Sequence, residues 1–184
     1  MLETFWDFSI RTYRTDDVPG ACISLQEERG VDVNMLLYCC WFGMTRGEQR
    51  ASFIQDVFEF SENWAKNVVR PLRQVRTWMK SDGCPDPRMV NEVCSGLRDK
   101  IKGNELAAEK IQQDVLESLT LTIPEQSLAL SDQLDAIIKN IRQYFDLVNI
   151  KLDDFTRDRL LIIIKAGMAE IPVNEIQTAL MAKD

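Results

Sequence analysis

The stretch DVNMLLYCCWFG, residues 32–43, constrains the fold more than any other part of the sequence. Eight apolar residues run without interruption from Met35 to Phe42. A helix that is apolar on all sides has to be buried on all sides, so we expect this stretch to be the central helix of a bundle. It is far shorter than the ~18–20 residues that span a bilayer, so no membrane insertion is expected.

The rest of the chain also favours helices. Apolar residues recur at spacings of three and four in nearly every segment, and the few Gly and Pro residues stand at breaks between segments. The run LLIII, residues 160–164, has strand propensity, but no second strand is available to pair with it. We therefore predict an all-α protein: a helical bundle over residues 1–122 and a smaller helical C-terminal segment over residues 125–184.

Several residues mark the ends of the predicted helices. Gly30 suits the left-handed position after a helix, and Asp32 suits the N-cap of the central helix. Gly43 is expected to end the central helix. Thr45 and Glu48 then have the spacing of a capping box, which predicts the start of the next helix. The central helix is thus expected over about residues 32–43.

Two further features concern long helices. Pro71 interrupts a helical pattern, and because proline removes a backbone hydrogen bond, a kink or a fresh start is expected there. Beyond Asp86 and Pro87, which resemble an N-cap and first helical residue, the apolar spacing predicts one long helix that ends at about Thr120.

The composition disfavours several kinds of chemistry. The chain has no histidine, which removes the commonest general base and a common zinc ligand. Its five cysteines form no CxxC pair and suggest neither a disulfide framework nor a zinc site. Adjacent residues such as Cys39 and Cys40 diverge by ~100° on a helix, so packing is a better explanation for them than redox chemistry. We expect a protein without a cofactor, with catalysis disfavoured, and, since no signal peptide pattern is present, a cytoplasmic location.

The segment KNVVRPLRQVRTWMK, residues 66–80, predicts a purely basic helical face. At 100° per residue its cations fall within about 120° of arc; they are Lys66, Arg70, Arg73, Arg76 and Lys80. One explanation is intramolecular pairing with the acidic second half of the chain, or simple solvation. The leading functional hypothesis is a non-enzymatic adaptor that binds an acidic protein through this face, and RNA binding is a further alternative.

A different hypothesis is an enzyme or carrier with an apolar pocket for a lipid or isoprenoid-like ligand. It is motivated by aromatic residues on and near the central helix, namely Phe5, Trp6, Trp41, Phe42 and Trp64, which equally suit a plain core. Asp154 and Asp158 share a helical face and are candidate Mg²⁺ ligands in this hypothesis. They also suit an ordinary helix N-terminus, and no second acidic motif faces them, so no metal site is expected.

Four segments resemble an uncharacterised family of small bacterial proteins known mainly from proteobacteria. They are FWDFSIRTY, VPGACISLQEERGVDVNMLLYCCWFG, VRPLRQVRTWMK and NELAAEKIQQ, and the resemblance covers about residues 4–120. It implies a cytoplasmic bacterial helical protein with no established activity, and it supplies no catalytic residues. The family has Leu-rich sequence where this chain has Cys39 and Cys40, which favours a packing role for both.

Overall fold

The structure, a computed structural model, describes residues 3–80 and 91–182. These residues form helices joined by turns and loops, and no strand occurs among them. The predicted all-α fold is therefore confirmed. The helices in chain order are α1 (Phe5–Tyr13), α2 (Val18–Arg29), α3 (Val33–Arg46), α4 (Ala51–Trp64), the π-helix η1 (Ala65–Val69), α5 (Arg70–Trp78), α6 (Asn91–Leu119), α7 (Leu130–Leu147), α8 (Asp154–Gly167) and α9 (Val173–Met181). Within these ranges, no helix has both the length and the apolarity needed to cross a membrane.

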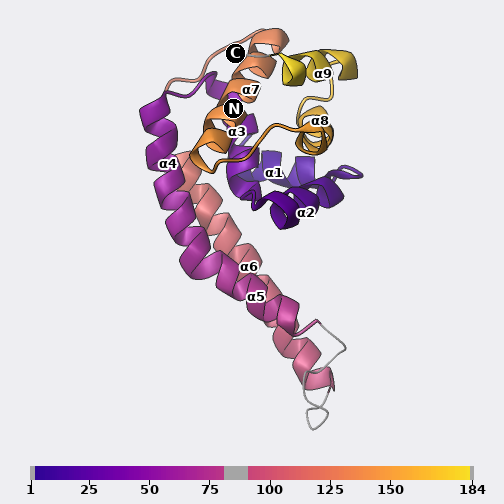
Figure 1. The fold of residues 1–184 in the computed structure, drawn as a ribbon. Helices are drawn as coiled ribbons and strands as arrows, with labels where there is room; N and C mark the ends of the chain where they lie inside the picture. Colours follow the sequence, from indigo (N-terminus) through magenta and orange to yellow (C-terminus); the bar gives the residue numbers. More distant parts are fainter. Residues whose placement is uncertain (1–2, 81–90, 183–184) are drawn as a thin grey trace.

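The central helix of the bundle is α3, as the apolar stretch predicts. Every residue from Met35 to Phe42 is buried, and α7 makes the most extensive contact with it. In Figure 1, α3 lies within the body of the molecule, between α7 and the pair α1 and α2. The side chain of Asp32 accepts hydrogen bonds from the backbone N–H of Asn34 (2.8 Å) and Met35 (3.4 Å), so the predicted N-cap is confirmed.

The predicted end of this helix is wrong. Gly43 lies inside α3, which continues to Arg46. A glycine is needed there because α7 crosses so closely that the position has no room for a side chain. A Cβ atom on Gly43 would lie 2.7 Å from Cγ1 and 2.9 Å from Cα of Ile137. The capping box is wrong as well: Thr45 is helical and its hydroxyl donates to the carbonyl of Trp41 (2.9 Å), while α4 begins at Ala51.

The turn between α2 and α3 follows the sequence signals. Gly30 has a left-handed backbone with φ of 71°. The N–H of Gly30 donates to the carbonyl of Gln26 (3.1 Å), and that of Val31 donates to the carbonyl of Leu25 (3.3 Å). Both Val31 and Leu25 are buried, so an apolar contact accompanies the end of α2.

The chain continues as a helix through Pro71, where a kink or a fresh start was expected. The five-residue π-helix η1 lies directly before α5, and Pro71 is the second residue of α5, so the hydrogen bond that proline removes falls next to the change from π-helix to α-helix. The continuous rod of α4, η1 and α5 packs beside α6 along its length. This rod and α6 form a long helical pair that extends away from the body (Figure 1). The predicted long helix corresponds to α6, whose described residues end at Leu119; Asp86 and Pro87 lie outside the described residues.

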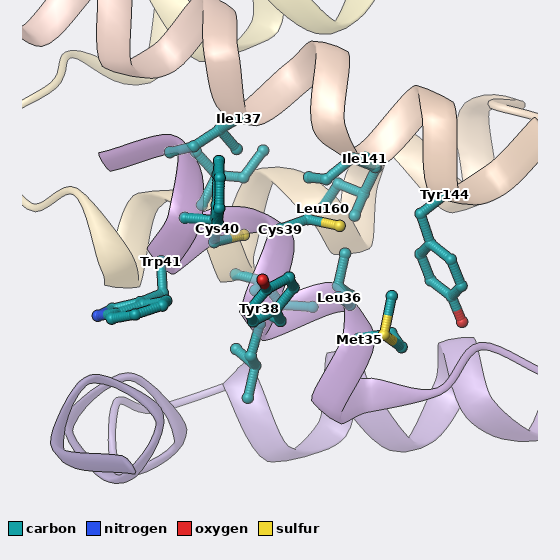
Figure 2. Packing of buried hydrophobic residues seen from close by; sticks show 14 of the residues in the cluster. Met35, Leu36, Tyr38, Cys39, Cys40, Trp41, Ile137, Ile141, Tyr144 and Leu160 are labelled. Atoms are coloured by element: carbon teal, nitrogen blue, oxygen red, sulfur yellow. The ribbon is translucent and has the colours of Figure 1, made fainter. Parts of the chain in front are cut away.

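The C-terminal helices pack against the bundle. α7 contacts α3 and α4, α8 contacts α1 and α2, and α9 contacts α7 and α8. The LLIII run lies in α8, where Leu160, Ile163 and Ile164 belong to the same apolar core as α3. Figure 2 shows Ile137, Ile141 and Leu160 gathered around the side chains of α3.

The close crossing of α3 and α7 gives a test of the packing. Gly43→Ala is expected to lower the free energy of unfolding by about 2–3 kcal/mol, because the added methyl group meets the backbone of Ile137. The matched control is Gly103→Ala in α6, where no atom lies within 4 Å of an added Cβ. This control should raise stability by about 0.5–1 kcal/mol, the helix preference of Ala over Gly. Urea unfolding measures both, and a stabilised Gly43→Ala would contradict the packing described.

Candidate functional site

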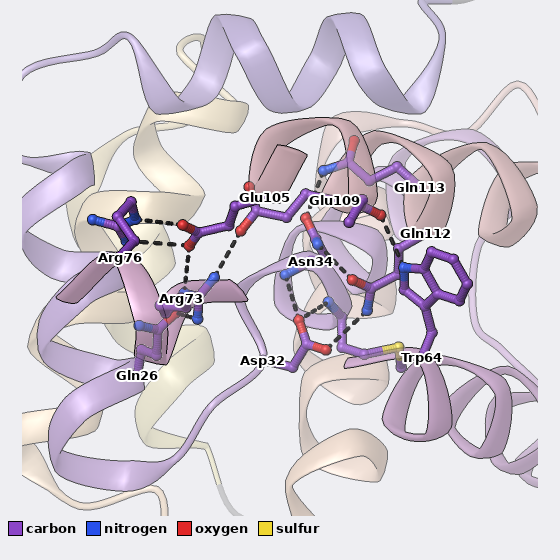
Figure 3. Close-up of polar contacts among 12 residues, drawn as sticks. Gln26, Asp32, Asn34, Trp64, Arg73, Arg76, Glu105, Glu109, Gln112 and Gln113 are labelled. Carbon is purple, nitrogen blue, oxygen red and sulfur yellow. Dashed lines mark hydrogen bonds and ion pairs between the residues drawn. The ribbon is translucent and has the colours of Figure 1, made fainter. Parts of the chain in front are cut away.

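The predicted basic face lies on η1, α5 and the turn that follows α5, and most of its charge is already paired. Arg70 binds both carboxylate oxygens of Glu62, with Nη1 at 2.9 Å from Oε1. Arg73 donates to Glu105 (2.9 Å), to Glu109 (2.7 Å) and to the amide oxygen of Gln26. Arg76 also donates to both carboxylate oxygens of Glu105, with Nη2 at 3.1 Å from Oε1 (Figure 3). The two lysines of the face, Lys66 and Lys80, are exposed and make no ion pair within residues 3–80 and 91–182.

Glu105 is the buried centre of these ion pairs. Burial alone would raise its pKa, but the hydrogen bonds and charges of Arg76 and Arg73 outweigh burial, and its pKa lies below the usual value. Glu109, one turn further along α6, behaves in the opposite way. Its pKa is raised because lost solvation outweighs the single hydrogen bond from Arg73. The carboxylates that pair with Arg73 and Arg76 thus come from α6, in the acidic second half of the chain.

A second polar network joins the start of α3 to the middle of α6. The amide of Asn34 donates to Gln112 (2.8 Å) and accepts from Gln113 (2.7 Å). Gln112 in turn donates to the carboxylate of Asp32 (3.0 Å) and to the hydroxyl of Ser61 (2.7 Å). Figure 3 shows this network beside the ion pairs of Arg73. Since Asn34, Gln112 and Gln113 are buried, these bonds fix the position of α6 relative to α3.

A cavity of about 820 Å³ lies between α1 and α2 on one side and η1, α5 and α6 on the other. Its lining is aromatic and aliphatic over much of the wall, with polar groups from both networks converging on it. The apolar lining includes Trp6, Ile10, Tyr13, Ile23, Val33, Leu37, Val69, Trp78 and Leu106, and the polar lining includes Gln26, Glu27, Asp32, Asn34, Arg70, Arg73, Glu109, Gln112 and Gln113.

The aromatic residues proposed as pocket lining divide between this cavity and the core. Trp6 lines the cavity. Phe5 and Trp41 pack against each other with ring centroids 5.5 Å apart, and Phe42 packs against Tyr38, all within the core. Trp64 donates its indole N–H to the carbonyl of Ala108 (2.9 Å), which ties α4 to α6.

The remaining candidates lie away from the cavity. Asp154 forms an ion pair with Arg157 (2.6 Å) on α8, and Asp158 is exposed on the same helix. Among the described residues, no three His, Cys, Asp or Glu side chains lie close enough together to hold a metal ion. The thiols of Cys39 and Cys40 are buried, burial raises both pKa values (that of Cys40 to about 12), and Cys39 donates to the carbonyl of Asn140 (3.5 Å). These surroundings suit packing. Cys94 is disulfide-bonded, which the cysteine spacing did not suggest.

Sequence reasoning missed the residues of α6 and α2 that complete the site. Glu105 and Glu109 are one helical turn apart, as are Arg73 and Arg76, so the two pairs have the spacing needed to meet across two helices. The sequence does not say that α5 and α6 are neighbours along this stretch. Gln26 and Ile23 carry no signal at all, because they look like an ordinary helix surface.

The fold and the site define an all-helical protein with an amphipathic cavity between its body and its long helical pair. The chain belongs to the family described as "Protein of unknown function (DUF2390)", which matches residues 4–116. No curated protein and no solved structure matches the chain. The matched range contains every lining residue of the cavity, from Trp6 to Gln113, whereas α7, α8 and α9 lie outside it.

The shared role of Glu105 predicts a large effect of its neutralisation. Glu105→Gln should lower the free energy of unfolding at pH 7 by on the order of 3 kcal/mol, because Arg73 and Arg76 lose a charged partner in a buried position. The contribution of a carboxylate with a lowered pKa is complete above the usual value of 4.5 and is lost as the pH falls through the lowered value. The difference in unfolding free energy between wild type and Glu105→Gln should therefore shrink as the pH falls below 4.5.

Urea unfolding at several pH values measures this difference. The control is Glu59→Gln, an exposed position on α4, which should change stability by less than about 0.5 kcal/mol. Equal stability of Glu105→Gln and Glu59→Gln at pH 7 would show that the buried ion pairs contribute little.

Proposed function

We propose that this protein binds a small amphipathic organic ligand in the cavity between α1, α2 and the long helical pair. The observation that carries the proposal is the cavity itself, whose volume of about 820 Å³ falls in the range of ligand sites, roughly 300–1,000 Å³. Ligand sites are typically apolar with a few polar groups that orient the ligand, and this lining has that composition.

The two parts of the lining have different roles in this proposal. Ile10, Val69 and Leu106 supply apolar surface from three different helices, so an apolar body would contact several helices rather than one face. Glu109 and Gln26 are held by Arg73, and Asn34 is held by Gln112 and Gln113. Polar groups that are positioned before binding lose less entropy when a ligand contacts them.

The pocket hypothesis drawn from the sequence agrees with this site in part. Its ligand also has an apolar body, and Trp6 lines the cavity. The other four aromatic residues of that hypothesis do not line the cavity, whose lining comes in large part from α2, α5 and α6 instead. Asp154 and Asp158 have no role in the proposed site, since they lie on α8 and do not line the cavity.

The hypothesis of an acidic protein partner stays a prediction, as do RNA binding and the cytoplasmic location. The internal ion pairs of Arg70, Arg73 and Arg76 weigh against the basic face as a binding surface, because a partner would have to displace them. Its test is charge reversal at Lys66 and Lys80, which leaves those ion pairs intact. Loss of a captured acidic protein or RNA from the double variant would favour this hypothesis, and unchanged capture would contradict it.

A substitution that fills the cavity tests the ligand proposal. Leu106 lines the cavity with 52% of its surface exposed, and Leu97 is 50% exposed on the same helix but does not line it. Leu106→Trp should weaken binding of the neutral apolar dye Nile red at least about tenfold, because the indole occupies space that the dye needs, whereas Leu97→Trp should leave binding unchanged. Fluorescence titration measures both affinities, with thermal unfolding as the check that each variant folds. No dye binding by wild type, or equal binding by all three proteins, would refute the proposal.

A further inference from the structure

The charges around the cavity indicate which kind of ligand it takes. Arg70 and Arg73 line the wall, and on sequence grounds they suggest an anion. In the structure each is already balanced: Arg70 by Glu62, and Arg73 by Glu105 and Glu109, with Arg76 sharing Glu105. These three arginines and three glutamates cancel, so the arginines leave little positive potential for a ligand.

Two more carboxylates belong to the lining and form no ion pair with an arginine or lysine among the described residues. Glu27 is exposed at the wall, and Asp32 is held by neutral donors from Gln112 and Ser61. Lys110 lies over the ring of Trp6 (5.5 Å to the centroid), but it is paired with Asp114. The cavity wall together with its ion-pair partners is therefore net negative, which favours a cation over an anion.

Glu109 is the carboxylate best placed to meet such a cation. Arg73 donates to its Oε1 at 2.7 Å, and no described residue donates a hydrogen bond to its Oε2. The residue is only partly exposed and lines the cavity. A carboxylate that is poorly solvated and bonded through one oxygen gains from a second cationic partner.

Aromatic residues support the same conclusion. Trp6, Tyr13 and Trp78 come from two different elements, α1 and α5, and all three line the cavity. Aromatic faces attract cations through the negative potential of the ring, and combined with a carboxylate they are a common setting for ammonium groups.

We propose that the ligand of this cavity is a small organic cation, with an ammonium head beside Glu109 and an apolar body along Ile10, Val69 and Leu106. This inference rests on the proposed function and names the chemical class of its ligand. It differs from the expectation of an anion partner because the internal carboxylates outnumber the arginines around the cavity.

Competition with bound Nile red tests the charge of the head at constant chain length. The probes are octylammonium, octan-1-ol and octanoate, which carry similar apolar bodies. Wild type should bind octylammonium about tenfold more tightly than octan-1-ol and octanoate most weakly, and this preference should decrease with ionic strength. Glu109→Gln should weaken octylammonium about tenfold, leave octan-1-ol within about twofold and strengthen octanoate, since Arg73 then keeps only Glu105. Glu59→Gln, on the exposed side of α4, is the matched control and should behave as wild type.

The outcomes separate this inference from the proposed function. If Nile red binds wild type and Leu106→Trp abolishes binding, the ligand site stands. Octylammonium that then competes no better than octan-1-ol, or a preference that Glu109→Gln leaves unchanged, overturns the cation inference alone. If Nile red does not bind wild type at all, both fail together. Thermal unfolding of Glu109→Gln, which keeps the ion pairs of Glu105, shows that a loss of octylammonium binding is not a loss of folding.

Discussion

The helix α3 carries apolar side chains around its whole circumference, and water has to be excluded from all of them at once. One neighbouring helix cannot do this. Five helices cover α3, namely α7, α1, α6, α2 and α8, and these contacts fix the positions of those helices. The closest of them is the crossing with α7, which is possible because Gly43 has no side chain. Burial of a single apolar helix thus determines the arrangement of the body.

The cavity follows from how α6 is attached to this body. Hydrogen bonds of Asp32 and Asn34 with Gln112 hold the middle of α6 at the start of α3. From that point the long helical pair leaves the body, while α1 and α2 remain on α3 (Figure 1). The cavity lies between the long helical pair and the helices α1 and α2, and both parts line it. Arg73 connects them at the cavity wall, since it forms ion pairs with α6 and a hydrogen bond with Gln26 of α2.

Local signals in the sequence predicted several helix ends, the capping box at Thr45 excepted, and predicted neighbouring helices poorly. The N-cap at Asp32, the left-handed Gly30 and the end of α6 at Leu119 depend on residues near them in the sequence, and all three are as expected. Gly43 was misread as a helix end because the need for a glycine there comes from Ile137 of α7, which is far along the chain.

The basic face shows the same limit. The arc of its five cations assumed 100° per residue, but η1 is a π-helix with wider turns, so that angle does not apply between Lys66 and the cations of α5. The sequence contains the glutamates that neutralise Arg73 and Arg76, but it does not show that α5 and α6 lie side by side. For the same reason Trp6 was the one cavity residue predicted as lining. The other four aromatic candidates pack in the core or tie α4 to α6.

The position of the cavity at the junction of two substructures has a thermodynamic consequence. Whatever fills it contacts α1 and α2 on one side and α5 and α6 on the other, so its free energy of binding adds to the contacts that hold the long helical pair against the body. By linkage, folding stability then increases with the logarithm of the concentration of that molecule once it exceeds its dissociation constant. Conversely, a substitution that weakens the packing of the long helical pair on the body would lower the affinity of the cavity for that molecule.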